Sequence, residues 1–297
     1  MTPPPPPCTS QATGASSNVA YDTPAAEAIA AAAAEAAPPS PMPDQQDECV
    51  LCCYPLPLKQ DETLYKECCG QVICRGCIIA QRRTLVIGTN VKKPVAGSKE
   101  EELEFIMIYG SKLPCLCPFC RAKEPTNDKE FLNRLWKRID EYKDPTAIGL
   151  LGQFYLKGNR GLSKNPKKAE KLFQMAYDLG DVEAAYMLSE LYSKHIPDQV
   201  RMMKYVDEGA RQGHTHCIFQ KADCEAESGN FEEATGLFMI AARLGHDISM
   251  KILPVFYRMK LLSKESLTTA LRAHKAANDK AKSGPREYAI RCDAFRE

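Results

Sequence analysis

The sequence carries cysteine pairs at spacings that suit metal ligation. Ten of its 14 cysteines lie between residues 49 and 121. Most of them form short pairs, namely Cys49 and Cys52, Cys74 and Cys77, Cys117 and Cys120, and the adjacent Cys68 and Cys69. A two-residue gap lets a turn aim two thiolates at one tetrahedral ion. Four pairs supply two closed zinc sites, which stabilise structure and do not activate water.

Two further cysteines stand next to these pairs and leave alternative ligands open. Cys53 follows Cys52, and Cys115 lies two residues before Cys117; we interpret both as spare thiols. Buried free cysteines would not produce three equal short spacings. A disulfide framework is disfavoured too, because the chain opens on a proline run and not on a charged and then apolar signal segment.

The cysteine-rich stretch resembles a RING finger from end to end. The residues that carry the resemblance are Cys49-x-x-Cys52, Cys69-Gly70-Gln71-x-x-Cys74-x-x-Cys77 and Cys117-Pro118-Phe119-Cys120-Arg121. Gln71 stands where the common pattern has a histidine ligand, and a glutamine amide is a poor donor to zinc. Cys68 restores the number of ligands, so the set is similar to the all-cysteine RING variant.

The resemblance implies a cross-braced order of ligands for two structural zinc ions. One ion would be held by Cys49, Cys52, Cys74 and Cys77, and the other by Cys68, Cys69, Cys117 and Cys120. It also implies that the chain binds a ubiquitin-conjugating enzyme and speeds transfer of ubiquitin from the enzyme's thioester to a substrate lysine. Such a ligase forms no covalent intermediate and works by holding reactants in an attack-ready geometry.

Four residues match positions that contact the conjugating enzyme or ubiquitin in that family. Leu51 and Pro118 lie between ligands and match its apolar contacts, and Ile78 extends that surface or packs in the core. Arg121 directly follows the last ligand, and its planar guanidinium can bond two partners at once. The alternative for Arg121 is a solvated surface arginine.

Composition places a tail before the cysteine-rich domain and excludes several function classes. Residues 1–47 hold two proline clusters and an alanine run, a composition that cannot bury a core, so we expect a disordered tail. The net charge of +1 gives no general attraction to nucleic acid or membrane. No apolar run is long enough to span a bilayer. We expect a soluble protein of the cytoplasm or nucleus with no membrane partner.

Several elements are expected between and after the ligands. Residues 48–122 form the finger; Pro55 and Pro57 make 54–66 a loop with a possible hairpin. A helix is expected after Cys77, and a strand at 105–109 beyond a polar insertion. Residues 123–143 form a linking helix in which Trp136 packs as core, with a surface anchor as the alternative.

Residues 144–282 contain a pattern that repeats with a period in the thirties. The units start at positions 147, 184, 217 and 249, and the first reads Ala147-x-x-x-Leu151-Gly152-x-x-Tyr155. Each of the first three units closes on a pair with at least one small residue and, three residues later, a glycine: Gly180, Gly213 or Gly245. A glycine at this point suits the end of a helix. Two helical stretches per unit at this period predict an all-α solenoid.

These units are similar to Sel1-like repeats, which are related to tetratricopeptide units. Unit three departs from the pattern, because Lys221 and Glu225 replace its Leu and Tyr, so we expect it to be looser. Residues 263–282 predict a terminal helix with a serine cap, and 283–297 a short tail. The resemblance implies that the repeats recruit a protein substrate or adaptor through their concave surface.

Two function classes remain open beside a ubiquitin ligase. The main alternative is a zinc-binding scaffold that assembles proteins without catalysing transfer. A nucleic-acid-binding protein is disfavoured, because the helix after Cys77 offers only Arg82 and Arg83 as a basic patch. The five histidines lie in the repeats without a paired nucleophile, and His214-x-His216 is interpreted as a turn feature.

Overall fold

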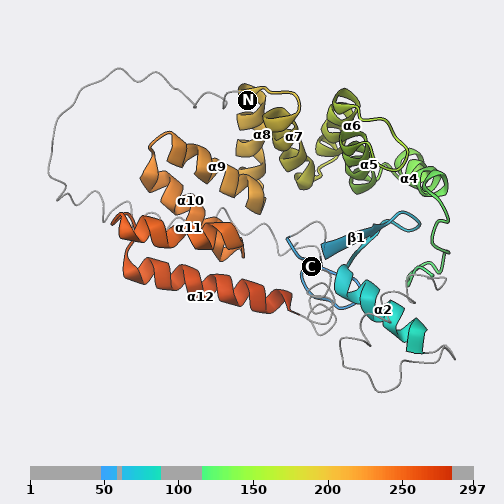
Figure 1. The fold of residues 1–297 in the computed structure, drawn as a ribbon, viewed down its shortest axis with the longest axis horizontal. Helices are drawn as coiled ribbons and strands as arrows, with labels where there is room; N and C mark the ends of the chain where they lie inside the picture. Colours follow the sequence, from blue (N-terminus) through green and yellow to red (C-terminus); the bar gives the residue numbers. More distant parts are fainter. Residues whose placement is uncertain (1–47, 59–61, 88–115, 283–297) are drawn as a thin grey trace, which may run out of the picture. The chain divides into compact units, whose positions relative to one another are not determined.

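A computed structural model describes residues 48–58, 62–87 and 116–282 of the 297-residue chain. The predicted tails, the strand predicted at 105–109 and Cys115 lie outside these residues, and the predicted domain boundaries stay predictions. Two short strands come first and helices follow (Figure 1). The described residues fall into two compact units: 48–191 with 276–282, and 192–275. Each unit is described by itself.

The two strands form an antiparallel hairpin around the adjacent cysteine pair. β1 (Thr63–Lys66) pairs with β2 (Gln71–Cys74), and Tyr65 lies opposite Val72. Gly70 closes the turn with φ of 74°, and its N–H donates to the Lys66 carbonyl at 2.8 Å. The hairpin considered for 54–66 was therefore misplaced, because its second strand follows the turn at Gly70.

The two faces of this hairpin contact different cores. Tyr65 and Val72 face the helices, where they pack with Leu135 and Ile139. On the other face, Ile73 packs with Cys49, Cys74, Cys77 and Ile78. Successive side chains of a strand point to opposite faces. Two strands of four residues each can therefore contact the cysteine cluster on one face and the helical part of the same unit on the other.

Two helices flank the last cysteine pair, Cys117 and Cys120, along the chain. α2 (Arg75–Ile87) confirms the helix expected after Cys77 and begins two residues earlier, which places Cys77 in its first turn. α4 (Asp128–Tyr142) is capped by Asn127 and buries Phe131, Leu135 and Ile139 in one stripe. The core position predicted for Trp136 was wrong. Its side chain is 40% exposed, because one residue past Leu135 is a rotation of about 100° away from the buried stripe.

Seven helices of nearly equal length follow α4. They are α5 (Pro145–Lys157), α6 (Pro166–Asp178), α7 (Val182–Lys194), α8 (Gln199–Arg211), α9 (Thr215–Glu227), α10 (Phe231–Arg243) and α11 (Asp247–Arg258). The predicted unit starts, Ala147, Ala184, Cys217 and Ser249, are each the third residue of α5, α7, α9 or α11, and all are at most 1% exposed. The structure confirms the predicted repeat and its register.

The second helices of units one and three, α6 and α10, bury an aromatic residue at the same position. Phe173 and Phe238 are both the eighth residue of their helices and are at most 1% exposed. Gly152 of α5 makes room for this packing, because a Cβ there would lie 2.6 Å from a ring carbon of Phe173. The closing glycines Gly180 and Gly245 adopt φ of 90° and 96°, as predicted for helix ends.

The third unit is not looser, contrary to expectation. α9 has the same 13 residues as its counterparts, and Ala222, one position past the missing leucine, is fully buried. Lys221 instead forms an ion pair with Asp207 of α8 at 3.0 Å. The terminal helix α12 (Lys264–Ala281) starts at the predicted cap, where the Ser263 hydroxyl accepts from the Ser266 N–H at 3.0 Å. Within the described part of the chain, no helix has the length and apolar character that crossing a bilayer requires.

Candidate metal centres

Two of the cysteine pairs lie in turns with the same backbone hydrogen bonds. In the first, the Cys49 N–H donates to the Tyr54 carbonyl at 2.9 Å, and the Cys53 N–H donates back to Cys49 at 2.7 Å. The turn at Cys117 repeats both bonds at 2.8 and 2.9 Å. The residue after the second cysteine, Cys53 or Arg121, has φ of 55° or 57°. Each turn therefore curls around the space between its own two thiols.

The eight predicted ligands come together as two groups of four. The first group contains Cys49, Cys52, Cys74 and Cys77, and the second Cys68, Cys69, Cys117 and Cys120. Within each group all sulfur atoms lie within 4.8 Å of one another. The groups interleave along the chain. The first and third cysteine pairs form one group, and the second and fourth pairs form the other. Cys53 is exposed and belongs to neither group.

The sulfur geometry fits a tetrahedral zinc ion. The separations between sulfur atoms are 3.8 Å for Cys49 and Cys77, 3.9 Å for Cys52 and Cys74, and 3.7 Å for Cys69 and Cys117. Zinc binds thiolate sulfur at about 2.3 Å, and a tetrahedron of that radius has edges of about 3.8 Å. These distances are far longer than the roughly 2.05 Å of a disulfide bond. Each group therefore has the donors and the spacing that one zinc ion requires.

The thiols of the first group differ in their affinity for protons. Burial raises the pKa of Cys49, but backbone N–H groups, that of Cys74 foremost, more than compensate and lower it to about 7. The Cys74 N–H lies 3.3 Å from the Cys49 sulfur. Burial, with the Cys74 thiol nearby, raises the pKa of Cys77. A divalent cation among the four sulfurs favours the thiolate form of each of them.

The second group depends on the hairpin turn. Cys68 and Cys69 occupy the turn itself. Burial, followed by the neighbouring thiols, raises the pKa of Cys68. Burial also raises the pKa of Cys69, to about 11, against the opposing effect of the Gln71 N–H. Gly70 allows the α4 side of the molecule to approach this turn, because a Cβ there would run into Arg138 and Asp144. The positive φ at Gly70 is a second reason for glycine.

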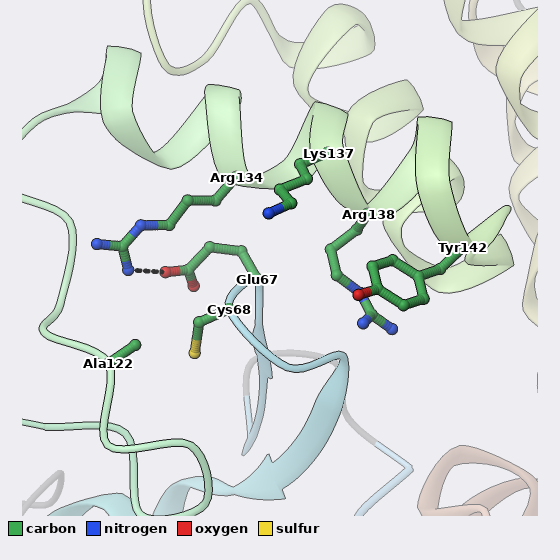
Figure 2. A pocket seen from close by; sticks show the side chains of 7 residues that line it. All are labelled: Glu67, Cys68, Ala122, Arg134, Lys137, Arg138 and Tyr142. Carbon is green, nitrogen blue, oxygen red and sulfur yellow. Dashed lines mark hydrogen bonds and ion pairs between the residues drawn. The ribbon is translucent and has the colours of Figure 1, made fainter.

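A basic cavity of about 360 Å³ lies beside Cys68 (Figure 2). Its lining consists of Glu67, Cys68, Ala122, Arg134, Lys137, Arg138 and Tyr142. Arg134 donates to Glu67 at 3.3 Å and to Glu130 at 2.6 Å. The Arg138 guanidinium stacks over the Tyr142 ring at 4.5 Å from its centroid. The arginines of this cavity therefore already pair with the chain's own carboxylates and hold α4 against the hairpin turn.

Asp144 joins the hairpin, α4 and α5 in one network that the sequence analysis missed. It accepts from the Tyr65 hydroxyl at 2.7 Å, from Arg138 at 2.7 Å, and from the Ala147 N–H at 3.2 Å as the N-cap of α5. Burial and then the Asp144 carboxylate raise the pKa of Tyr65. An aspartate before Pro145 signals a helix start, but nothing local in the sequence indicates its bond to Tyr65, 79 positions away.

The predicted contact residues lie in different environments. Leu51 is 39% exposed between the first two thiols, and Pro118 is half-buried in the matching turn. Arg121 is exposed. Ile78 is only 8% exposed and packs with the cysteine cluster, so core packing accounts for it. Gln81 of α2 donates to the Leu116 carbonyl at 2.8 Å, which ties the second turn to this helix.

Comparison with known proteins gives limited matches. No protein-family model and no curated protein matches the sequence. A Sel1 repeat protein from Oxalobacter formigenes is 19% identical, covers 66% of this chain and 73% of its own, and has a TM-score of 0.44. A protective antigen of uropathogenic Escherichia coli with an SLR fold is 14% identical, covers 72% and 51%, and has a TM-score of 0.41. Similarities at this level leave the family of the chain open.

Proposed function

We propose that the chain is a RING-type ubiquitin ligase that binds two structural zinc ions and recruits a protein substrate through Sel1-like helical repeats. The interleaving of the two cysteine groups carries this proposal, because it is the order of ligands that a cross-braced finger requires. In this assignment Cys49, Cys52, Cys74 and Cys77 bind one ion, and Cys68, Cys69, Cys117 and Cys120 the other. The ions hold the turns in place and take no part in chemistry.

The surface next to the proposed ions suits a protein partner. Exposed apolar side chains lie in both cysteine turns, with Val50 at 45% and Phe119 at 37% exposure in addition to Leu51. Such side chains are costly to leave in water unless a partner covers them. In the proposed function they contact the ubiquitin-conjugating enzyme, and Arg121 donates to ubiquitin and the enzyme together, so the chain positions the thioester without reacting with it.

Autoubiquitination by the purified full chain tests the proposal. The chain is incubated with an activating enzyme, ubiquitin and a panel of conjugating enzymes. We expect at least one enzyme to give ubiquitin conjugates, and Leu51→Ala and Arg121→Ala to reduce the rate about tenfold or more, since each removes a contact to the enzyme pair. Trp136→Ala, which changes an exposed aromatic residue of α4, serves as the matched control and should leave the rate unchanged.

The alternative is a zinc-binding scaffold without ligase activity. It is supported by the extent of the helical repeats relative to the cysteine-rich part. Inactivity with every conjugating enzyme, in protein shown by native mass spectrometry to hold two zinc ions, would overturn the ligase proposal in favour of the scaffold. Inactivity in protein with fewer ions would instead overturn the zinc assignment.

A further inference from the structure

α11 and its C-cap residue, Met259, carry a stripe of apolar side chains at the spacing of a coiled-coil seam. Ile248, Ile252, Val255 and Met259 follow one another at intervals of four, three and four residues. These are the d, a, d and a positions of a heptad. Ile248 is 51% exposed, Val255 42% and Met259 49%, while Ile252 is half-buried at the edge of the core. Most of this seam faces outward.

The rest of α11 explains why these residues are not part of the core. Ser249, Leu253 and Phe256 are buried and anchor the helix to its own unit. The core therefore needs only one side of α11. Three large apolar side chains of the stripe are each about half-exposed. Exposed apolar surface costs about 25 cal/mol of hydrophobic free energy for each Å². A continuous stripe of this kind differs from single apolar residues scattered over a surface.

Charges beside the seam indicate the chemistry of its partner. Lys251 and Arg258 both occupy g positions, directly next to the a and d residues, and both are exposed. In the part of the chain that the structure describes, neither has an ion pair. The e positions on the other side are Ser249 and Phe256, which are buried. The seam therefore has one open edge, and that edge is cationic.

We propose that α11 is a docking site for an amphipathic helix of another protein, with apolar residues at its own a and d positions and acidic residues at e or g. The seam spans 12 residues, or about 16 Å, which is three turns of the partner helix. Acidic side chains on the partner pair with Lys251 and Arg258 and fix its register. This proposal rests on the recruiting role proposed for the repeats and names the class of its partner.

Charge complementarity argues against a second copy of α11 as the partner. In a parallel pair, Lys251 and Arg258 would face Ser249 and Phe256, neither of which is acidic. In an antiparallel pair, the g positions face each other, so cation would meet cation. Both orientations leave the cationic edge unpaired or repelled. An acidic helix satisfies the edge and covers the apolar seam in one step.

Binding of designed peptides to the full chain tests this site. The probe is a fluorescent helical peptide with leucine at a and d and glutamate at e and g, and its partner probe has lysine in place of glutamate. By fluorescence anisotropy at low salt, we expect the acidic peptide to bind at least about tenfold more tightly than the basic one. Val255→Glu should weaken binding of the acidic peptide by at least about tenfold, since it places a charge in the seam.

The control and the charge reversal make the result specific. Val200→Glu changes a valine of α8 that is 82% exposed, and should leave affinity unchanged. The double variant Lys251→Glu with Arg258→Glu should prefer the basic peptide. Circular dichroism establishes that each variant is folded. Equal affinity for both peptides, no binding of either, or self-association of the chain that Val255→Glu abolishes would overturn the proposal.

The assay contains no ubiquitin or conjugating enzyme, so its outcome is distinguishable from that of the ligase test. If the acidic peptide does not bind but autoubiquitination is intact, only the docking-site proposal is overturned. Binding through the seam in a chain that is inactive with every conjugating enzyme would keep the site as part of the scaffold alternative.

Discussion

Two buried clusters of the molecule differ in what they are made of. The cluster under the cysteine turns consists of Ile73, Ile78 and three cysteines. The cluster in α9 to α12 is larger and uses alanine, leucine, phenylalanine and methionine. A cluster as small as the first buries too little apolar surface to fix its turns, whereas the second can stabilise helices by packing alone. The comparison indicates that the cysteine-rich part needs an additional source of stability, which two zinc ions would supply.

Replacing one proposed zinc ligand should produce the largest difference between the effects on the cysteine-rich part and on the repeats. A structural zinc site contributes roughly 10 to 16 kcal/mol of coupled binding and folding free energy. For Cys77→Ser we expect native mass spectrometry to find one zinc ion instead of two, while circular dichroism shows that most helix remains, because α5 to α11 do not depend on the metal. Cys53→Ser is the matched control. Retention of two ions by the first variant, or loss of one by the second, contradicts the assignment of ligands.

A cavity in the repeats should have the reverse effect. Phe173→Ala removes a fully buried ring from α6 and is expected to cost about 3 to 5 kcal/mol. Thermal unfolding followed at 222 nm should shift to lower temperature, and the zinc content should stay at two. Met175→Ala, at a 39% exposed position of the same helix, should change the unfolding temperature little. A loss of zinc in the Phe173 variant would mean that the two regions are not independent.

Asp144 tests how strongly the hairpin is joined to α4 and α5. Asp144→Ala removes the cap of α5, the partner of Arg138 and the acceptor of Tyr65, and should cost about 2 to 4 kcal/mol by urea unfolding. Asp144→Asn keeps the cap and loses the ion pair, so it should fall between the wild type and Asp144→Ala. Equal stabilities of Asp144→Asn and the wild type would show that the ion pair contributes nothing measurable, and equal stabilities of the two variants would show the same of the cap.

The repeats could be predicted from sequence because their signal is local and periodic. The third position of α5, α7, α9 and α11 is small and buried each time, and the closing glycines mark the helix ends. The prediction failed in unit three, where Lys221 and Glu225 depart from the pattern. Lys221 was taken as a sign of a loose unit, but Asp207 pairs with it and Ala222 takes over the buried position. Contacts with residues that are close in space, which the repeat pattern does not contain, stabilise this unit in place of the missing leucine.

The grouping of the cysteines in the candidate site could be predicted from sequence, and the contacts that support it could not. Spacing and family resemblance together indicated the eight cysteines, and the structure brings them together in two groups of four. The bonds of Asp144 to Tyr65 and Arg138, and the fit of Gly70 against α4, depend on packing between segments far apart in sequence. Trp136 shows the same limit, since a helix face is set by the partner that covers it and not by apolar character.

The smallest expected effect concerns the pH dependence of the repeats. His246 caps α11 from a buried position, where its Nδ1 lies 2.9 Å from the Ser249 hydroxyl. Burial, reinforced by His216 and His274 and opposed by Asp247, lowers the pKa of His246 to about 4. A histidine with a depressed folded pKa binds its proton more readily when unfolded. Stability is therefore present above about pH 6.5 and is lost as the pH falls toward 4.

Between pH 7 and pH 5 this difference in pKa amounts to about 2 kcal/mol of unfolding free energy. His246→Asn keeps a side chain that can cap α11 and removes the titrating group. We expect urea unfolding to show a decrease in stability from pH 7 to pH 5 in the wild type and a smaller decrease in His246→Asn. His195→Asn, at an exposed loop position, should retain the wild-type slope. The same slope in all three proteins would mean that His246 is not the group that titrates.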